Sequence, residues 1–227
     1  MTVTLITGAN KGIGFETARQ LAERGHDLWI GARDRERGER AAAELGVRSV
    51  QLDVTDDDSV AAALAVIDEA SGRLDLLVHN AGILETGLDG PTAVRMFDTN
   101  AVGMVRVTEA ALPLLRRSSS AHVVTVSSSM GSFWAVNNPA RAESQLPLAL
   151  YAASKAAATM LSVQYAKVHP GITFTALEPG TTATDMTAGF GIGRPVAETA
   201  GVVVRLALEG VGGPSGTLRD ENGELPW

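Results

Sequence analysis

Two side chains four residues apart point to proton chemistry: the phenol of Tyr151 and the ammonium of Lys155, in the segment LALYAASKAAATM. On an α-helix this spacing places both groups on one face. A free phenol, with a pKa of about 10, is a poor acid at neutral pH. A neighbouring ammonium stabilises the phenolate and lowers that pKa, so the pair could exchange a proton with an alcohol or carbonyl oxygen. The same spacing also arises by chance in helices, as a half-buried tyrosine beside a solvated lysine.

A glycine-rich turn near the N-terminus supports the functional interpretation. The segment TVTLITGANKGIGFETARQLAERG reads as an apolar strand, a turn and an amphipathic helix. Gly8, Gly12 and Gly14 stand where a tight turn, close approach to a pyrophosphate and close helix packing each exclude a side chain. The N-terminus of the helix offers free N–H groups and a positive dipole to phosphates. A strand, a glycine turn and a helix in this order predict a nucleotide cofactor site in preference to a mere tight loop.

With both motifs present, the chain resembles the short-chain dehydrogenase/reductase family over essentially its whole length. The resemblance rests on motifs that follow one another in the family's order: TGANKGIG at 7–14, LDV at 52–54, HNAG at 79–82, NAVG at 100–103, VSSSMG at 126–131, YAASK at 151–155 and EPGTTATD at 178–185. The glycine spacing is similar to that of the compact reductase branch. The resemblance implies one NADP(H)-binding reductase domain over residues 1–227.

The resemblance also assigns four catalytic residues. Tyr151 would donate the proton, and Ser128, three residues before Gly131, would hold and polarise the substrate oxygen. Lys155 would lower the pKa of Tyr151 and bind the nicotinamide ribose. Asn100 would kink the long central helix and hold a water that links Lys155 to solvent; a buried amide that serves only the backbone is the alternative, and the two roles are compatible.

Further residues would bind the cofactor by the same resemblance. They lie in the glycine turn, after the second, third, fourth and sixth strands, and in the YAASK segment. This set comprises Gly8, Asn10, Lys11, Gly12, Ile13, Gly14, Arg33, Asp53, Val54, Asn80, Ala81, Gly82, Tyr151, Lys155, Pro179, Gly180, Thr182 and Thr184. His79 replaces the first asparagine of the family's usual Asn-Asn-Ala-Gly and is interpreted as a packing residue, because no metal partner is evident.

The end of the second strand, LWIGARDRER, predicts the choice of cofactor. An NAD site places an acidic side chain there, about 20 residues beyond the glycines, and that carboxylate would repel a 2′-phosphate. Ala32 stands at this position, Arg33 follows it, and Lys11 lies in the glycine turn. Two cations could therefore flank a 2′-phosphate, and we expect NADP(H) to be preferred over NAD(H). Alternatively, Arg33 is only a solvated residue at the start of a helix.

Strands and helices alternate along the chain, which predicts a doubly wound α/β fold: a parallel seven-stranded sheet (Rossmann fold) in the order 3-2-1-4-5-6-7, with helices on both faces. The acidic run 56–58 is interpreted as a helix start beside Thr55. We expect strands near 3–7, 27–32, 48–52, 75–79, 121–127, 172–177 and 215–219. We expect helices near 12–24, 35–45, 57–71, 91–115, 149–169 and 195–209.

The connection between Ser128 and Tyr151 is longer than in the most compact members of the family and resembles the carbonyl reductase branch. It carries Phe133 and Trp134, which we expect to form an apolar wall of the substrate site; packing into the core is the alternative. The connection lies beside the helix that pairs subunits in the family. We therefore expect a monomer or homodimer in preference to a tetramer.

Composition excludes several functions. The chain has 227 residues and no cysteine, so disulfides, thiolate catalysis and cysteine-bound metals are excluded, and no metal site is predicted. A net charge of −7 with 4% aromatic residues argues against nucleic acid or anionic membrane as a partner. With no signal peptide or long apolar run, the expected location is the cytoplasm.

Together these features predict reversible reduction of a carbonyl compound (a ketone, aldehyde or quinone) to an alcohol, with a small-molecule substrate and NADPH. The cofactor would carry the redox chemistry while the protein orients and polarises the substrate. A non-catalytic NADP(H)-binding sensor or regulatory protein on the same fold is the alternative. Retention of the complete Asn-Ser-Tyr-Lys set argues against that alternative.

Overall fold

A computed structural model describes residues 1–191, 193–210 and 213–227. One sheet runs through the molecule in the order β3-β2-β1-β4-β5-β6-β7-β8. Its strands are β1 (Val3–Thr7), β2 (Asp27–Ala32), β3 (Arg48–Gln51), β4 (Leu76–His79), β5 (His122–Val126), β6 (Thr173–Leu177), β7 (Thr217–Asp220) and β8 (Gly223–Glu224). The expected parallel order of seven strands is confirmed. The short antiparallel β8, paired through Arg219 and Glu224, was not expected.

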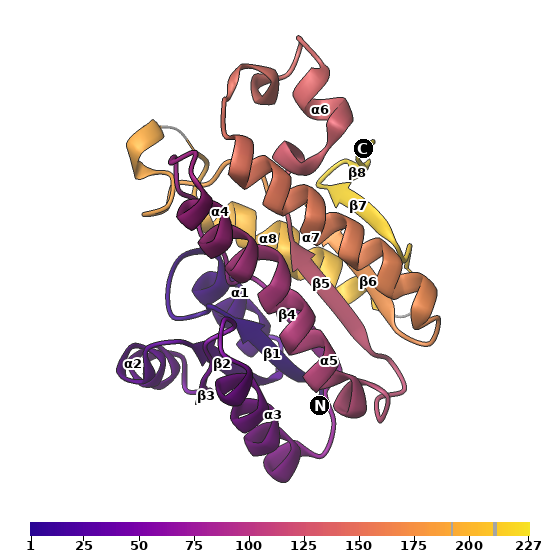
Figure 1. Ribbon diagram of the computed structural model, residues 1–227. Helices are drawn as coiled ribbons and strands as arrows, with labels where there is room; N and C mark the ends of the chain where they lie inside the picture. The colour runs from indigo at the N-terminus through magenta and orange to yellow at the C-terminus, as the bar shows by residue number, and fades with distance from the viewer. Residues whose placement is uncertain (192, 211–212) are drawn as a thin grey trace.

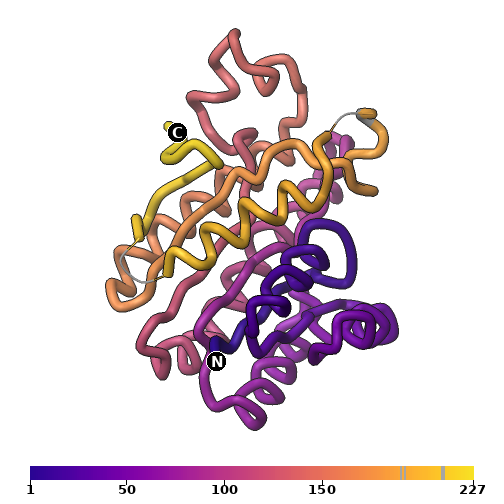
Figure 2. Tube along the Cα trace, turned by 180° about the vertical axis from the view of Figure 1, so that it is seen from behind, coloured from indigo at the N-terminus to yellow at the C-terminus, as the bar shows by residue number. Residues whose placement is uncertain are grey.

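Helices cover both faces of the sheet. They are α1 (Gly12–Ala22), α2 (Arg35–Leu45), α3 (Asp57–Ser71), α4 (Gly90–Phe97), α5 (Gly103–Leu115), α6 (Phe133–Asn137), α7 (Ala149–Val168) and α8 (Val196–Glu209). Figure 1 shows α3, α5 and α7 in front of the sheet, and Figure 2 shows α1 and α8 from behind. Each face has its own buried apolar cluster, so the central strands are buried on both sides.

Local signals in the sequence set the starts and ends of several helices. The Asp34 carboxylate accepts a hydrogen bond from the backbone N–H of Arg37 at the start of α2 (3.0 Å), and Asp56 accepts one from Ser59 at the start of α3 (3.0 Å). Gly46 and Gly72 end these two helices with positive φ angles of 65° and 69°. The structural interpretation of the acidic run is thus confirmed, with Asp56 rather than Thr55 as the capping residue.

The helix expected over 91–115 is interrupted. Its two α-helical parts, α4 and α5, are joined by a π-helical turn, Asp98–Val102. A π-turn displaces the backbone from the regular α-helical bonding pattern and is frequent at functional sites. Asn100 lies at the centre of this turn, where the resemblance had placed a kink.

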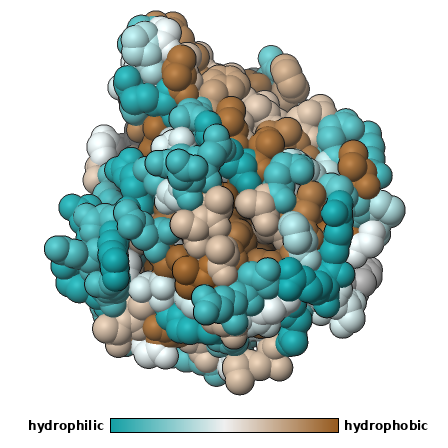
Figure 3. Space-filling view, turned by 60° about the horizontal axis from the view of Figure 1, so that its bottom comes forward, coloured by the Kyte–Doolittle hydropathy of each residue, from teal (hydrophilic) through white to brown (hydrophobic). Residues whose placement is uncertain are grey.

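Two features of the molecule concern contact with a membrane: the distribution of hydrophobic residues on the surface, and the length and hydropathy of the helices. On the face shown in Figure 3, hydrophobic residues form patches among hydrophilic ones. Among the described residues, no helix is both long and apolar enough to span a membrane.

The order of the strands determines where a ligand can reach several loops at once. β1 lies between β2 and β4, so the chain leaves β1 toward one side of the sheet and leaves β4 toward the other. In an open parallel sheet a crevice forms at the carboxyl ends of the strands at such a reversal of order. The glycine turn follows β1, and residues 128–131, which we call the serine turn, follow β5 at the same edge.

Replacing Gly131 by alanine should force the serine turn away from α7. The added Cβ would lie 2.6 Å from the backbone nitrogen of Ala156 and 2.7 Å from the carbonyl carbon of Lys155. Overpacking of this kind costs about 1–3 kcal/mol, which corresponds to a fall of roughly 2–12 °C in the melting temperature. Gly171→Ala is the matched control, because its Cβ would meet nothing within 4 Å. Equal melting temperatures for the two variants would contradict this account.

Candidate active site

The serine turn and the start of α7 bring the expected catalytic side chains together. Tyr151 lies in the first turn of α7, and the Ser128 side chain lies close enough to its phenol to lower the pKa of that group. Ser127, by contrast, is buried: its Oγ lies 3.2 Å from the Lys155 carbonyl oxygen and 2.6 Å from Thr159 Oγ1. Ser129 is buried on another side of the turn. Of the three consecutive serines, Ser128 therefore faces the phenol.

Lys155 is buried in the interior behind Tyr151. Its side chain Nζ donates a hydrogen bond of 2.8 Å to the carbonyl oxygen of Val126, the last residue of β5. Nζ lies 5.8 Å from the centroid of the Tyr151 ring. Removal from water disfavours the charged form and lowers the pKa of Lys155 to about 8, although the nearby Glu178 carboxylate opposes this shift.

The pKa of Tyr151 shifts in the direction opposite to the one expected. Burial, followed by the negative charge of Glu178, raises it to about 12, and the nearby Ser128 side chain lowers it only in part. The expectation that Lys155 lowers this pKa is therefore wrong for the arrangement seen here. The physical reason is that two effects disfavour the phenolate. One is burial of the phenol, and the other is the negative charge of Glu178, whose position near Tyr151 the motifs did not predict.

Asn100 is buried and makes three hydrogen bonds. Its Oδ1 accepts from the backbone N–H of Ile83 (2.8 Å), and its Nδ2 donates to the Ile83 carbonyl oxygen (2.9 Å) and to Ser154 Oγ (2.9 Å). Ser154 in turn donates to the carbonyl oxygen of Tyr151 (2.8 Å). The amide therefore serves the backbone, as the alternative interpretation held, and it also ties the π-turn to the start of α7.

A small cavity lies behind these residues. Asn100, Lys155, His79, Thr125 and Thr7 supply polar groups to its lining. Its volume of about 10 Å³ is close to the space that one water needs. The cavity thus places room for a single water beside both Asn100 and Lys155.

His79 is a packing residue, as expected. Burial lowers its pKa to about 3, and its Nε2 lies 2.9 Å from Thr108 Oγ1. Among the residues that the structure describes, no group of three or more histidine, aspartate or glutamate side chains could hold a metal ion.

The glycine turn leaves no room for side chains. Gly8 and Gly12 have positive φ angles of 63° and 59°. A Cβ at Gly14 would lie 2.4 Å from Nδ2 of Asn80, and one at Gly8 would lie 2.9 Å from the Cα of Ala81. The N-cap of α1, Lys11, makes no side-chain hydrogen bond to the first turn of the helix. A backbone cradle with N–H groups at a helix start fits a pyrophosphate, so the residues present suit a dinucleotide.

The other residues expected at the cofactor lie around the same edge of the sheet. The Asn80 amide braces the glycine turn by donating to the carbonyl oxygens of Thr7 and Gly8, both at 3.0 Å. Asp53 accepts from the backbone N–H (3.0 Å) and the hydroxyl (2.7 Å) of Thr55. Asn80 thus holds the neighbouring glycine turn, and Asp53 holds its own loop.

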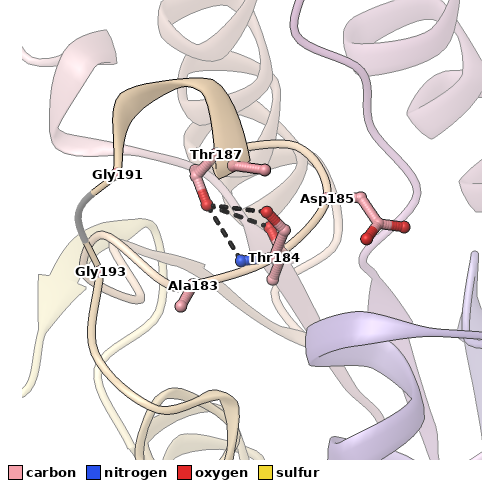
Figure 4. Close-up of a pocket in the computed structure, with 7 residues that line it drawn as sticks. Ala183, Thr184, Asp185, Thr187, Gly191 and Gly193 are labelled. Atoms are coloured by element: carbon pink, nitrogen blue, oxygen red, sulfur yellow. Dashed lines mark hydrogen bonds between the residues drawn. The ribbon is translucent and has the colours of Figure 1, made fainter.

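The segment after β6 forms an open hollow of about 380 Å³ (Figure 4). Its lining comes from Ala183, Thr184, Asp185, Thr187, Ala188, Gly191 and Gly193. The Thr187 hydroxyl accepts from the backbone N–H of Thr184 (3.0 Å) and holds the loop in its curve. Thr182 is buried and its hydroxyl lies 2.8 Å from that of Thr199.

An ion pair spans the opening between the glycine turn and this segment. Lys11 Nζ lies 2.7 Å from Asp185 Oδ2, and both side chains are largely exposed. Lys11, expected beside a 2′-phosphate, is therefore engaged elsewhere. Ala32 is buried. A Cβ added at Gly38 would lie only 3.0 Å from the Cβ of Ala32. Arg33 is exposed and, among the described residues, makes no ion pair with a carboxylate within 4.0 Å.

Three residues of this site were not identified from the sequence. They are Thr7, which accepts hydrogen bonds from the backbone N–H groups of Asn80 and Ala81, Ser154, which links Asn100 to α7, and Glu178. Thr7 and Ser154 stand inside the motifs TGANKGIG and YAASK, so their position was the available signal. Glu178 precedes Pro179, and nothing in that spacing shows which way its side chain points.

Comparison with known proteins agrees with this geometry. The chain matches the family described as short chain dehydrogenase over residues 2–194. A short-chain dehydrogenase, anuI, of Penicillium roqueforti is 34% identical over 92% of this chain and 89% of its own. The (−)-isopiperitenone reductase of Mentha piperita is also 34% identical, over 93% and 94% of the two chains.

Solved structures give the same result. The NADPH-bound carbonyl reductase from chicken fatty liver superposes with a TM-score of 0.88 at 25% identity, covering 100% of both chains. Salutaridine reductase from Papaver somniferum superposes with a TM-score of 0.85 at 28% identity, covering 96% of this chain and 99% of its own.

Proposed function

We propose that this chain, which belongs to the short-chain dehydrogenase family, reduces a ketone, aldehyde or quinone to an alcohol with NADPH, and that the reaction is reversible. The observation that carries the proposal is the convergence of the serine turn (Ser128), the π-turn (Asn100) and α7 (Tyr151 and Lys155) at one edge of the sheet. The names of similar proteins, among them (−)-isopiperitenone reductase and an NADPH-bound carbonyl reductase, support a reductase.

Tyr151 is the proton donor in this proposal. The phenol is protonated at neutral pH and so carries the proton that the carbonyl oxygen receives as it becomes an alcohol. Ser128, which lies near the phenol, holds and polarises the same oxygen. NADPH, when bound, supplies the hydride that the carbonyl carbon receives.

Lys155 and Asn100 support the proton donor. Lys155 binds the nicotinamide ribose and returns a proton toward Tyr151, and its pKa of about 8 suits exchange near neutral pH. Asn100 holds a water that links Lys155 to solvent, so that protons can pass between them. The small cavity beside Asn100 and Lys155 has room for this water.

The remaining cofactor contacts follow the edge of the sheet. The glycine turn binds the pyrophosphate through Gly8, Asn10, Lys11, Gly12, Ile13 and Gly14. The edge of the adenine is held by Asp53 and Val54. The adenosine ribose is lined by Asn80, Ala81 and Gly82. Pro179, Gly180, Thr182 and Thr184 hold the nicotinamide. We propose that residues 1–227 act together as one catalytic domain, as a monomer or homodimer.

Phe133 and Trp134 form the substrate wall in this proposal. They begin α6 directly after the serine turn, and 73% of Phe133 and 41% of Trp134 are exposed, which argues against a role in the core. The Arg141 guanidinium lies 5.3 Å from the centroid of the Trp134 ring.

Tyr151→Phe should abolish turnover while NADPH still binds. The change removes one phenolic hydroxyl and keeps the ring, so the proton donor is lost with little change in shape. Loss of one catalytic acid reduces the rate by about 10²–10⁴-fold. NADPH consumption with an active carbonyl substrate and NADPH binding by fluorescence measure the two effects. A substantial residual rate would place the proton donor elsewhere.

NADPH should be preferred over NADH, with Arg33 supplying most of the preference. Its guanidinium presents paired donors to phosphate oxygens, and such a contact contributes about 1.5–3 kcal/mol, roughly tenfold to a hundredfold in affinity. Arg33→Ala should raise the KM for NADPH within that range, leave the KM for NADH nearly unchanged, and lose effect in high salt. Arg116→Ala, which removes an exposed charge at the end of α5, is the control. Equal use of both cofactors by the unmodified protein would refute this prediction.

Trp134→Ala should change the relative rates on bulky and small carbonyl substrates more than it changes the melting temperature. The half-exposed ring contributes little to core packing, and in this proposal it borders the bound substrate. Relative kcat/KM over a substrate series and a thermal melt are the measurements. A large fall in melting temperature with unchanged relative rates would show that the ring is structural.

A further inference from the structure

Glu178 connects the two turns that enclose the proposed reaction site. It follows β6 directly, and its carboxylate accepts two backbone hydrogen bonds. Oε1 accepts from the N–H of Gly180 at 2.6 Å, and Oε2 accepts from the N–H of Ser129 in the serine turn. One carboxylate thus joins the end of β6 to the residue beside Ser128.

The position of Ser128 depends on these contacts. Ser128 Oγ accepts from the Met130 N–H at 3.2 Å, and the Ser129 backbone N–H donates to Glu178. The Glu143 carboxylate lies near the Ser129 side chain. Glu143 is itself paired with Arg141 at 2.6 Å. Between β5 and α7 the turn therefore has little freedom to move, and a carboxylate bonded to two N–H groups is the strongest of its polar anchors.

The same carboxylate lies close to the proton donor. Tyr151 is faced by the Ser128 hydroxyl from the β5 side, by the Lys155 ammonium from its own helix and by Glu178 from the β6 side. Arg141, from the connection that follows α6, is also near enough to Glu178 for their charges to interact. Of these groups, Glu178 is the one that carries a negative charge and raises the pKa of Tyr151.

We infer that Glu178 is a positioning residue for the proposed reduction: it holds Ser128 opposite Tyr151 by clamping the serine turn to the Pro179–Gly180 turn. This inference rests on the proposed function. The charge of Glu178 acts on Tyr151, and its two hydrogen bonds act on Ser128.

Two substitutions separate the clamp from the charge. Glu178→Gln keeps the length of the side chain but has one carbonyl oxygen, so one backbone N–H loses its acceptor and the negative charge is lost. Glu178→Asp keeps the charge but is one methylene shorter, so it cannot reach both turns. Glu44→Gln, an exposed glutamate near the end of α2, is the charge-matched control. Circular dichroism and thermal melts establish which variants are folded.

The first readout is the titration of the phenol in the protein without cofactor or substrate. The chain has two tyrosines, so in a Tyr165→Phe background Tyr151 is the one phenol that titrates. Phenolate absorbance is followed to the highest pH at which circular dichroism remains native. Glu178→Gln should show more phenolate at a given alkaline pH, because removal of the carboxylate lowers the pKa of Tyr151. Glu178→Asp and Glu44→Gln should match their parent.

The second readout is the pH dependence of carbonyl reduction. Both Glu178 variants should lose about tenfold in kcat, the factor that corresponds to about 1.4 kcal/mol of lost positioning, with the KM for NADPH changed by less than about twofold. In Glu178→Gln the alkaline loss of activity should also begin at lower pH, because the proton donor is lost as pH rises through the lowered pKa of Tyr151.

The two readouts distinguish failure of this inference from failure of the proposed function. If the unmodified protein reduces no carbonyl compound, the proposed function fails, while the titration still tests whether Glu178 acts on Tyr151. Equal phenolate absorbance in Glu178→Gln and its parent, together with unchanged kcat, would overturn the inference. So would a Glu178→Asp variant with the full kcat, because the clamp would then be unnecessary.

Discussion

The site depends on one interaction that has a cost in desolvation. The ammonium of Lys155 is buried behind the phenol of Tyr151, which it was expected to activate. An ammonium removed from water needs a partner, and the Val126 carbonyl at the end of β5 is that partner, 2.8 Å from Nζ. The contact ties α7 to the central strand, and the Ser127 hydroxyl reinforces it at the Lys155 carbonyl oxygen. Because α7 is held at this point, Tyr151 one turn earlier is held as well, next to Ser128. The fall in the pKa of Lys155 to about 8 is the consequence of this burial, and it brings the group into the range where proton exchange occurs near neutral pH.

Around this anchor the loops at the carboxyl ends of the strands are joined by side chains from distant parts of the sequence. Asn80 braces the glycine turn, Asn100 and Ser154 join the π-turn to α7, and Glu178 joins the serine turn to the end of β6. Lys11 and Asp185 meet across the opening that the dinucleotide would enter. Each of these contacts links two segments at this edge of the sheet, so the edge behaves as one connected frame. The proposed reduction needs such a frame because hydride and proton would have to reach adjacent atoms of one substrate.

Much of the fold was readable from the sequence because its signals are local. The apolar runs at 3–7 and 27–32, the aspartate caps at Asp34 and Asp56, and the glycines at 46 and 72 specify strands and helix ends by periodicity and backbone conformation alone. The two-residue β8 and the short α6 carry no such period and were not predicted. In the site, motif order located Ser128, Tyr151, Lys155 and Asn100. The sign of the Tyr151 pKa shift was wrong because it depends on burial and on Glu178, which reaches the site only through the folding of β6 beside β5. The partner of Lys11 was missed for the same reason, since Asp185 is distant in sequence.

The central claim is that the frame supports catalysis and does not merely hold a nucleotide. The most direct measurement is NADPH consumption by the purified, unmodified protein, followed spectrophotometrically across diketones, quinones, and aliphatic and aryl ketones, with the alcohol product quantified in parallel. The account predicts oxidation of NADPH with at least one of these classes, in a one-to-one ratio to the alcohol or hydroquinone formed. NADPH that binds with a defined affinity yet is not oxidised in the presence of any of them would contradict the account and favour a protein that senses the cofactor.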